Sequence, residues 1–356
     1  MCACWTSSSI DPMALRRVVV TQRFFDQGAI SYLQDHGCEV VIAPLPTGQA
    51  DGDVSRSTLL RWLDGAAGWI VGHARVTREL LEACPDLKIV ARRGVGYERV
   101  DVAAVKDLGR VATIAAGGND ETVADQAIGL MIALGRRFRE CQLSLSKDSW
   151  TIPLGTDLYR KTVGVVGLGR IGRAVVRRLM AFDARILVHT PQLDPGTART
   201  LGFEYVDFRT LLRESDYVTL HAPLNAQTRF LIREETIGLM KPTAYLINTA
   251  RGGLVEDGDL LRALQERRLA GAGLDVFMSE SDSHYEPVTR QLIDRVNVVA
   301  LPHAGASTRE GLDRTNLVAS KCVVAVLDGD MPPTGCTVAD GRRSRPAIAG
   351  EPPDRT

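Results

Sequence analysis

Residues 163–172 read VGVVGLGRIG, and this stretch decides the fold. Gly167, Gly169 and Gly172 form a G-x-G-x-x-G pattern after a run of apolar residues and before an amphipathic segment over 173–182. In a strand–turn–helix context, the first glycine permits the tight turn and the second lets a pyrophosphate approach the backbone, while the third lets the helix pack on the strand. The helix N-terminus then presents its N–H groups to the phosphates. The stretch therefore predicts a dinucleotide site in a parallel α/β sheet.

Short apolar runs alternate with amphipathic segments on both sides of the glycine loop. Helices are predicted over 27–36 and 77–83. The predicted strands before the loop are 17–21, 39–42, 69–71 and 87–91. A second series of predicted strands covers 162–166, 185–189, 217–221, 244–248, 271–277 and 296–300. Such a βαβα rhythm indicates a doubly wound parallel sheet. Because one sheet does not easily hold both series, we expect an α/β fold with two doubly wound parallel-sheet domains.

Three further segments lie outside these series. Residues 122–145 have a helical period and are rich in Ala, Leu and Ile, so they are expected to bridge the domains or to pack against a partner subunit. Residues 1–15 are polar and rich in Ser, and residues 332–356 are rich in Pro, Gly and charge. Neither end buries much apolar surface, so we expect both to be disordered.

Composition excludes several classes of protein. The chain has 356 residues, which suits two or three domains, and its 43 Lys and Arg balance its 43 Asp and Glu. Zero net charge argues against bulk attraction to nucleic acid or to an anionic membrane as the main activity. No apolar run is long enough to span a membrane. The N-terminus lacks a basic-then-apolar signal region, so a cytoplasmic location is expected.

The cysteines and histidines predict neither a disulfide framework nor a metal site. Seven cysteines are scattered without a Cys-x-x-Cys pair, and their odd number argues against a closed set of disulfides. The six histidines form no His-x-x-x-His pair and no cluster with cysteine. We therefore expect mostly reduced, buried cysteines and no bound zinc.

The choice between NAD and NADP depends on the end of the second strand. An acidic residue about 20 positions after the glycine loop normally binds the ribose 2′-hydroxyl. Here the strand over 185–189 is followed by Thr190, so that acid is missing. A neutral Thr190 does not repel a 2′-phosphate, yet no arginine follows at once to bind one, and both NAD and NADP stay open. Asp194 is either a displaced acid or a structural turn residue, and the turn is the simpler interpretation.

Five downstream and upstream segments carry a family resemblance: RRGVGYERVD at 92–101, GGNDETVAD at 117–125, LINTARGGL at 246–254, GAGLDVF at 271–277 and LPHAGAST at 301–308. Together with the glycine loop, they resemble the D-isomer-specific 2-hydroxyacid dehydrogenases, in particular D-3-phosphoglycerate dehydrogenases and hydroxypyruvate/glyoxylate reductases. The resemblance covers roughly residues 17–331, and five motifs in the right order are jointly very specific.

The resemblance implies how the domains are arranged. A Rossmann dinucleotide-binding domain over 118–305 would be inserted into a flavodoxin-like substrate-binding domain made of 16–117 and 306–331. It also implies a homodimer formed through the cofactor domain and the helix at 122–145.

The resemblance implies three catalytic residues, Arg251, Glu280 and His303. Reduction of a 2-oxo acid needs a cation for the carboxylate and carbonyl and a proton donor near neutral pH, and Arg and His supply these. Glu280 would pair with His303, fix its tautomer and favour its charged form. Taken singly, such an Arg or His is more often a solvated loop residue or a turn cap, but both follow predicted strands, where α/β sheets bind ligands. The family's Glu-Pro is Glu-Ser here, which leaves Glu286, before Pro287, as a rival acid.

The resemblance also implies further contacts. On the cofactor these are Arg170 and Ile171 at the pyrophosphate, His221, Ala222 and Pro223 on the adenosine side, and Thr228, Thr249 and Asp275, the last near the nicotinamide amide. His221 ends a predicted strand and is equally well a structural residue. On the substrate, the Val95 and Gly96 amides would bind the carboxylate as an anion nest does, and Asn119 would touch substrate or cofactor. Arg92, beside Arg93, either meets a second anionic group or faces water.

These residues predict an NAD(P)-dependent oxidoreductase for a small anionic D-2-hydroxy acid or 2-oxo acid. The substrate would be of the 3-phosphoglycerate, glycerate/hydroxypyruvate or glycolate/glyoxylate type, bound between the domains. One alternative is an NAD(H)-sensing, corepressor-like binding protein, although no partner-binding motif is evident. Another is a phosphite or formate dehydrogenase of the same family. Phosphite enzymes carry a lysine near the position of Val95, and its absence here makes that alternative weaker. A formate enzyme is expected to have longer N-terminal and active-site segments.

Overall fold

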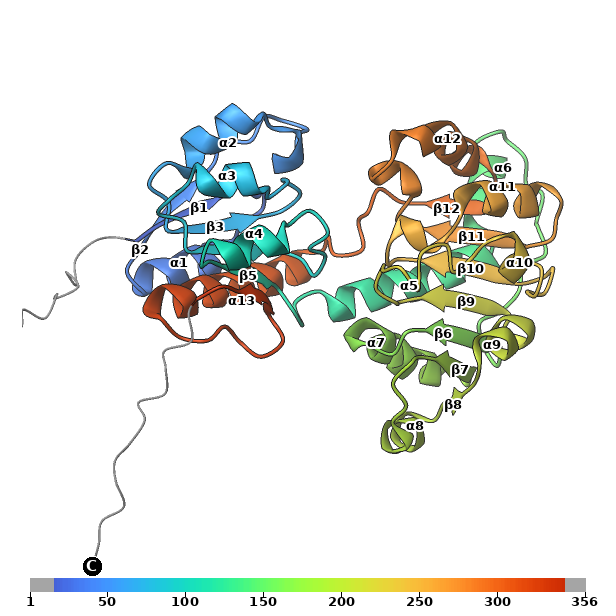
Figure 1. The fold of residues 1–356 in the computed structure, drawn as a ribbon. Coiled ribbons are helices and arrows are strands. Elements are labelled where there is room, and N and C mark those ends of the chain that lie inside the picture. Colours follow the sequence, from blue (N-terminus) through green and yellow to red (C-terminus); the bar gives the residue numbers. More distant parts are fainter. Residues whose placement is uncertain (1–15, 343–356) are drawn as a thin grey trace, which may run out of the picture. The chain divides into compact units, whose positions relative to one another are not determined.

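The structure, a computed structural model, describes residues 16–342, which form two compact units (Figure 1). The first unit contains residues 16–119 and 309–342, and the second contains residues 120–308. The disorder expected for residues 1–15 falls outside the described range, as does the part of the C-terminal expectation beyond 342. Within the described range, no helix is both long and apolar enough to cross a membrane.

The first unit is a six-stranded sheet in the order β13-β5-β4-β3-β1-β2, parallel except for β13 (Figure 1). Its parallel part has the 2-1-3-4-5 order of flavodoxin-like folds. The strands are β1 (Arg16–Val20), β2 (Cys38–Ile42), β3 (Gly68–Val71), β4 (Ile89–Arg92), β5 (Val111–Ile114) and β13 (Thr337–Asp340). The helices are α1 (Gln27–Asp35), η1 (Asp51–Asp53), α2 (Arg56–Leu63), α3 (Arg78–Glu82), α4 (Val102–Asp107) and α13 (Arg309–Asp328).

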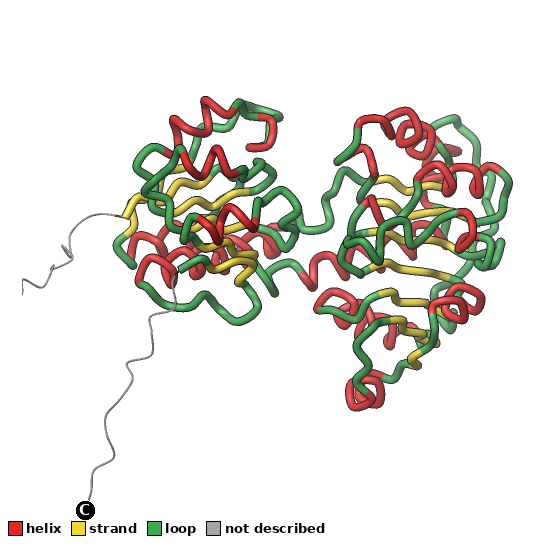
Figure 2. Tube along the Cα trace, in the orientation of Figure 1, coloured by secondary structure: helices red, strands yellow, loops and turns green. Residues whose placement is uncertain are grey.

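Both faces of this sheet are buried. Val18 and Val20 belong to one hydrophobic cluster and Val19 to another, because successive side chains of a strand point to opposite faces. The strands accordingly lie between helices in each unit (Figure 2). A sheet covered on both faces explains why its strands are near-continuous apolar runs rather than alternating ones.

The strand β13 corrects the expectation that 332–356 is disordered. Thr337–Asp340 pairs antiparallel with β5, and the Ile114 N–H donates to the Cys336 carbonyl at 2.8 Å. Cys336 and Ala339 are both buried in the core of the unit. Composition misled here because an edge strand needs only a free sheet edge and a few apolar side chains, even in a segment rich in Pro and Gly.

The second unit is a seven-stranded parallel sheet in the order β12-β11-β10-β9-β6-β7-β8. Counted from β6, this is the 3-2-1-4-5-6 order of a dinucleotide-binding sheet with one more strand at its edge. The strands are β6 (Thr162–Val166), β7 (Arg185–His189), β8 (Glu204–Tyr205), β9 (Tyr217–Leu220), β10 (Tyr245–Asn248), β11 (Gly271–Leu274) and β12 (Val298–Ala300). The sequence predicted six of these seven strands and missed β8, whose two residues are too few to show a pattern.

The helices of the second unit include the segment predicted as one helix over 122–145, and that expectation is wrong. Two helices, α5 and α6, are separated by Arg137, whose φ of 54° is left-handed. The apolar residues of α5 pack inside the unit, whereas α6 buries none of its residues. The helices are α5 (Asp120–Gly135), α6 (Phe138–Leu145), α7 (Arg170–Leu179), η2 (Met180–Phe182), α8 (Pro195–Leu201), α9 (Phe208–Glu214), α10 (Glu234–Ile237), η3 (Gly252–Leu254), α11 (Asp257–Gln265), η4 (Met278–Glu280), η5 (Ser283–Tyr285) and α12 (Glu286–Asp294).

Candidate active site

Three predicted side chains lie at the carboxyl edge of the second sheet. Arg251 follows β10, Glu280 ends η4 after β11, and His303 follows β12. These strands are neighbours and run parallel, so their carboxyl ends lie at one edge. Glu280 Oε2 is 2.6 Å from His303 Nδ1, and both side chains are 39% exposed. It is therefore Glu280 that holds His303, while the rival Glu286 is an exposed residue at the start of α12.

The electrostatics of this pair keep Glu280 ionised. Burial alone would raise the pKa of Glu280, but the hydrogen bond and charge of His303, the Phe277 N–H and the charge of Arg251 together lower it below its usual 4.5. The Phe277 N–H donates to Oε1 at 2.9 Å, so each carboxylate oxygen has its own partner. An ionised Glu280 fixes the orientation and the tautomer of the imidazole.

The backbone of His303 is held in a left-handed conformation with φ of 54°. Its N–H donates to the Asp275 carbonyl at 2.8 Å. The buried Asp275 carboxylate accepts the Ala304 and Gly305 N–H groups at 2.7 and 2.9 Å. Asp275, which the family resemblance assigns to the nicotinamide, fixes the loop that carries the imidazole. Each carboxylate oxygen keeps a second lone pair for another donor.

A further buried acid, which no motif marks in the sequence, holds the backbone next to Glu280. Asp257, the first residue of α11, is 2% exposed and accepts the Met278 N–H at 3.1 Å. Burial, together with the negative charges of Glu256 and Glu280, raises its pKa to about 7, although the Met278 N–H opposes the rise. An Asp in the first turn of a helix is so common that no sequence signal marks this contact.

The glycine loop has the shape of a dinucleotide cradle. Gly167 has φ of 94°, and a Cβ there would lie 2.8 Å from backbone atoms of His221 and Ala222. A Cβ on Gly172 would lie 2.1 Å from the Gly167 carbonyl oxygen, whereas one on Gly169 would meet nothing within 4 Å. The first and third glycines are therefore needed for packing, and the second faces open space. Since Gly169 caps α7 without a side-chain hydrogen bond, the residues present fit a bound pyrophosphate.

The remaining predicted cofactor residues follow β9, β10 and β11 of the same sheet. Burial lowers the pKa of His221 to about 3, so its ring is neutral, and its Nε2 lies 2.9 Å from Thr219 Oγ1. Thr228 Oγ1 donates to the Pro223 carbonyl at 2.6 Å and braces that turn. Thr249 is 7% exposed, and its hydroxyl has no hydrogen-bond partner within the described part of the chain. A buried hydroxyl in that state fits a bound polar ligand.

The residues relevant to NAD or NADP lie after β7. Thr190 follows the strand directly and is half-buried. Asp194 is the N-cap of α8 and accepts the Gly196 and Thr197 N–H groups at 3.0 and 3.2 Å. The structure therefore gives Asp194 the role of helix N-cap. Arg170 and Ile171 begin α7 next to the glycine loop, with Arg170 exposed.

The predicted substrate residues lie at the carboxyl edge of the first sheet. The amides of Val95 and Gly96 donate no hydrogen bond to any of residues 16–342. Arg92 Nε donates to the Gly96 carbonyl at 2.8 Å and so braces the loop. Asn119 is 5% exposed, and its buried Oδ1 accepts no hydrogen bond from the same residues. Two amides and one amide oxygen are thus available for a ligand.

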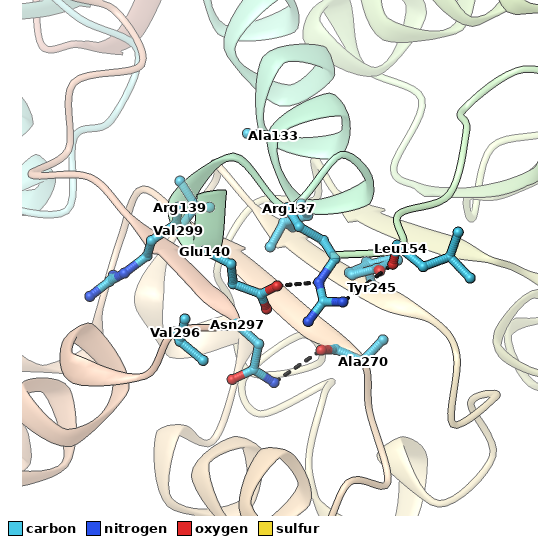
Figure 3. Close-up of a pocket in the computed structure, with 11 residues that line it drawn as sticks. Ala133, Arg137, Arg139, Glu140, Leu154, Tyr245, Ala270, Val296, Asn297 and Val299 are labelled. Atoms are coloured by element: carbon cyan, nitrogen blue, oxygen red, sulfur yellow. Dashed lines mark hydrogen bonds and ion pairs between the residues drawn. The ribbon is translucent and has the colours of Figure 1, made fainter. Parts of the chain in front are cut away.

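A cavity of about 230 Å³ lies at the opposite edge of the second sheet (Figure 3). Tyr245, Ala270 and Asn297 line it at the amino ends of β10, β11 and β12. Arg137 forms an ion pair with Glu140 there. The cavity is therefore separate from the group formed by Arg251, Glu280 and His303. Nowhere in residues 16–342 do three or more His, Cys, Asp or Glu side chains gather closely enough to hold a metal ion.

Comparisons with known proteins identify a family for this chain. The model of the "D-isomer specific 2-hydroxyacid dehydrogenase, NAD binding domain" matches residues 128–305. The chain is 38% identical over 268 residues to a glyoxylate reductase of Thermococcus litoralis, covering 73% of this chain and 80% of the relative. It is 35% identical to a D-3-phosphoglycerate dehydrogenase of Methanocaldococcus jannaschii, covering 88% of this chain but only 58% of that relative. A D-lactate dehydrogenase of Aquifex aeolicus, solved with NAD and lactic acid, superposes with a TM-score of 0.77 at 28% identity, covering 91% of this chain and 99% of that one.

The raised pKa of Asp257 predicts a pH-dependent stability. An acid whose pKa rises on folding, here from 3.8 to about 7, stabilises the folded state least at high pH, because the folded state must give up its proton. Relative to Asp257→Asn, the wild type should therefore lose about 2–3 kcal/mol of unfolding free energy between about pH 5 and pH 8. Urea unfolding at both pH values measures this difference.

The matched control is Asp294→Asn, which changes an exposed aspartate of the same unit. It should show no such pH-dependent difference from the wild type. If the unfolding free energies of the wild type and Asp257→Asn changed equally between these pH values, Asp257 would not titrate in this range.

Proposed function

This chain belongs to the D-isomer specific 2-hydroxyacid dehydrogenase family, and we propose that it reduces a small 2-oxo acid to the D-2-hydroxy acid with NADH or NADPH. It is an oxidoreductase that acts on a CH–OH group and uses a nicotinamide cofactor. The candidate substrates are glyoxylate, hydroxypyruvate and 3-phosphohydroxypyruvate. The observation that carries the proposal is the 2.6 Å contact between Glu280 and His303 at the edge that also holds Arg251.

Each catalytic side chain has a role in this reduction. The Arg251 guanidinium binds the substrate carboxylate and polarises the carbonyl with paired N–H donors. Since His303 uses Nδ1 to contact Glu280, Nε2 is the ring nitrogen that gives a proton to the forming C2 hydroxyl, and Glu280 stabilises the imidazolium before the transfer. The nicotinamide, when bound, supplies the hydride to C2. In the reverse direction, the same imidazole accepts the hydroxyl proton.

Binding roles follow from the groups left without partners. We assign residues 118–305 to the dinucleotide, with the glycine loop at the pyrophosphate and Thr249 and Asp275 toward the nicotinamide. Residues 16–117 and 306–331 are assigned to the substrate. There the Val95 and Gly96 amides hold the carboxylate, Asn119 contacts the ligand, and Arg92 braces the loop.

Substitution of the catalytic residues tests the proposal directly. His303→Ala and Arg251→Ala should each lower turnover of 2-oxo acids by about 10²-fold or more, because each removes a group that acts on the reacting carbonyl. NADH binding should survive, since neither side chain belongs to the glycine loop. The assay is oxidation of NADH and NADPH with the three candidate 2-oxo acids, together with a fluorescence titration of NADH.

Glu286→Gln is the control, because it changes the exposed acid that does not contact His303, and it should keep wild-type turnover. A wild-type protein that binds NADH and turns over no 2-oxo acid would overturn the proposal in favour of a cofactor-sensing protein. Near-normal turnover by His303→Ala would show that another group moves the proton.

Cofactor preference is proposed to depend on Thr190. Thr190→Asp places a carboxylate where it can accept hydrogen bonds from the ribose hydroxyls and repel a 2′-phosphate. The ratio of kcat/KM for NADH to that for NADPH should rise by about tenfold or more. Thr190→Asn, which adds similar bulk without charge, is the control. An unchanged ratio in Thr190→Asp would place the selection of the ribose elsewhere.

We also propose a homodimer, with an interface on α6 and the segment that follows it. Trp150, Ile152 and Leu154 are 85%, 91% and 92% exposed, and Phe138 and Leu145 of α6 are also exposed. Exposed apolar groups at such density are typical of protein–protein contacts. These residues support a contact after α5 rather than on it, because the apolar residues of α5 pack inside the unit.

Polar substitutions in this segment should weaken the dimer. Trp150→Ser combined with Leu154→Ser removes two of the largest exposed apolar side chains, and the dimer dissociation constant should rise by about 10²-fold. Sedimentation velocity over a dilution series measures this change. Leu193→Ser, at another exposed leucine of the same unit, is the matched control and should leave the dimer intact. A wild-type protein that is monomeric at all concentrations would rule out the dimer.

A further inference from the structure

Asp257 does not cap its own helix. The first-turn position of an acid normally serves the N–H groups of that helix. In α11 this role belongs to Glu256, whose carboxylate accepts the Gly258 N–H at 3.4 Å and the Tyr285 hydroxyl at 3.1 Å. Asp257 is instead buried and directs its carboxylate to Met278, in a different segment. The role of this buried acid must therefore lie in the segment that it contacts, outside α11.

The segment that Asp257 holds is the one that carries Glu280. Met278 and Glu280 begin and end η4, so the backbone anchored at Met278 is only two residues from the carboxylate. The same turn places the Phe277 N–H on Glu280 Oε1 at 2.9 Å, which leaves Oε2 for His303. Three successive hydrogen bonds therefore join Asp257 to the imidazole, through Met278, Phe277–Glu280 and His303.

Asp257 also lies where two catalytic loops touch. A Cβ on Gly252, next to Arg251, would lie 2.2 Å from the backbone carbonyl of Phe277 and 2.6 Å from the Met278 nitrogen. The loop after β10 and the loop after β11 are thus in direct contact at this point. The hydrogen bond from Met278 to Asp257 crosses that contact, so it ties the position of Arg251 to that of Glu280.

We propose that Asp257 is a positioning residue of the reaction, which holds η4 through the Met278 N–H and so keeps Glu280 against His303. The inference rests on the proposed function, because it assigns Asp257 a part in the proton transfer made by that pair. Asp257 touches neither substrate nor cofactor in this scheme. Its effect reaches the reacting atoms only through Glu280.

The charge of Asp257 adds an electrostatic contribution to the positioning. The charged groups that act on it are Glu256, from its own helix, and Glu280, from η4, and both are acidic. Because burial raises the pKa of Asp257 to about 7, its carboxylate gains and loses a proton near neutral pH. The ionised form adds a negative charge beside Glu280, which favours the protonated state of the Glu280–His303 pair. The hydrogen-bond effect and the charge effect are separable by substitution.

Asp257→Ala removes the acceptor and tests the positioning. We expect kcat to fall by about 10- to 100-fold, since a small displacement of Glu280 is enough to misalign the proton donor. KM for the 2-oxo acid and the dissociation constant of NADH should change by less than about twofold, because neither ligand contacts Asp257. In a Glu280→Gln background, Asp257→Ala should lower kcat by no more than about a further twofold, as expected for residues that act through one another.

Asp257→Asn keeps an oxygen acceptor for Met278 and removes the charge. Its kcat should stay within about threefold of the wild type at the optimum. The limb of the pH profile that reports the protonated pair should move to lower pH by about 0.5–1 unit, because the negative charge that favours protonation is gone. This variant also keeps the test decisive where Asp257→Ala does not fold.

Several outcomes would overturn the inference. Wild-type kcat in Asp257→Ala would do so, and so would an equal loss of kcat in the wild-type and Glu280→Gln backgrounds, which indicates general destabilisation. An unshifted pH profile in Asp257→Asn would remove the electrostatic contribution. The failure of the proposed function is a different result, namely no turnover of any 2-oxo acid by the wild type. Amide exchange at Met278, which should be faster in Asp257→Ala, tests the hydrogen bond even then.

Discussion

Buried carboxylates that accept backbone N–H groups hold the loops at the carboxyl edges of both sheets. In the second unit, Asp275 accepts two N–H groups of the His303 loop, and Asp257 accepts that of Met278. In the first unit, the fully buried Asp51 accepts the N–H groups of residues 72–74 at 2.6–3.1 Å. An uncompensated buried carboxylate is destabilising by several kcal/mol, so each of these acids depends on the amides it holds.

This arrangement separates two kinds of backbone amide at the strand ends. Parallel strands end with N–H groups that no longer pair within the sheet, and the loops must satisfy them or leave them for a ligand. In the second unit, the amides held by Asp257 and Asp275 fix the loops that carry Glu280 and His303. The amides of Val95 and Gly96 and those at the start of α7 have no such acid, and these are the ones assigned to anionic groups of substrate and cofactor. In the proposed function, an anionic group of the ligand takes the place of the missing aspartate at these amides.

The sequence predicts most strands well, because a strand is marked by residues that are adjacent in the chain. The strands at 162–166 and 185–189 have the predicted limits, since a buried parallel strand is a continuous apolar run between turn signals. The sequence did not predict the break between α5 and α6 at Arg137. The spacing of apolar residues does not reveal a single residue with a left-handed backbone. The hydrogen bond of Asp257 with Met278 was missed for a different reason: it joins segments 21 residues apart that no motif links. Arg251 and His303 could be proposed as catalytic residues because they lie inside motifs, whereas Glu280 lies three residues beyond one and was proposed from the family resemblance.

The charges around His303 also bear on how an anionic substrate is used. Glu280 is kept ionised by His303, the Phe277 N–H and the charge of Arg251, against the effect of its own burial. In the proposed reaction, a substrate carboxylate bound to Arg251 would neutralise that cation and add a negative charge near the pair. Both changes favour a proton on the Glu280–His303 pair, which is the state that reduction of a carbonyl requires. In this scheme the substrate's own charge, rather than a field of the whole protein, would prepare the proton donor, and a chain with zero net charge needs such local control.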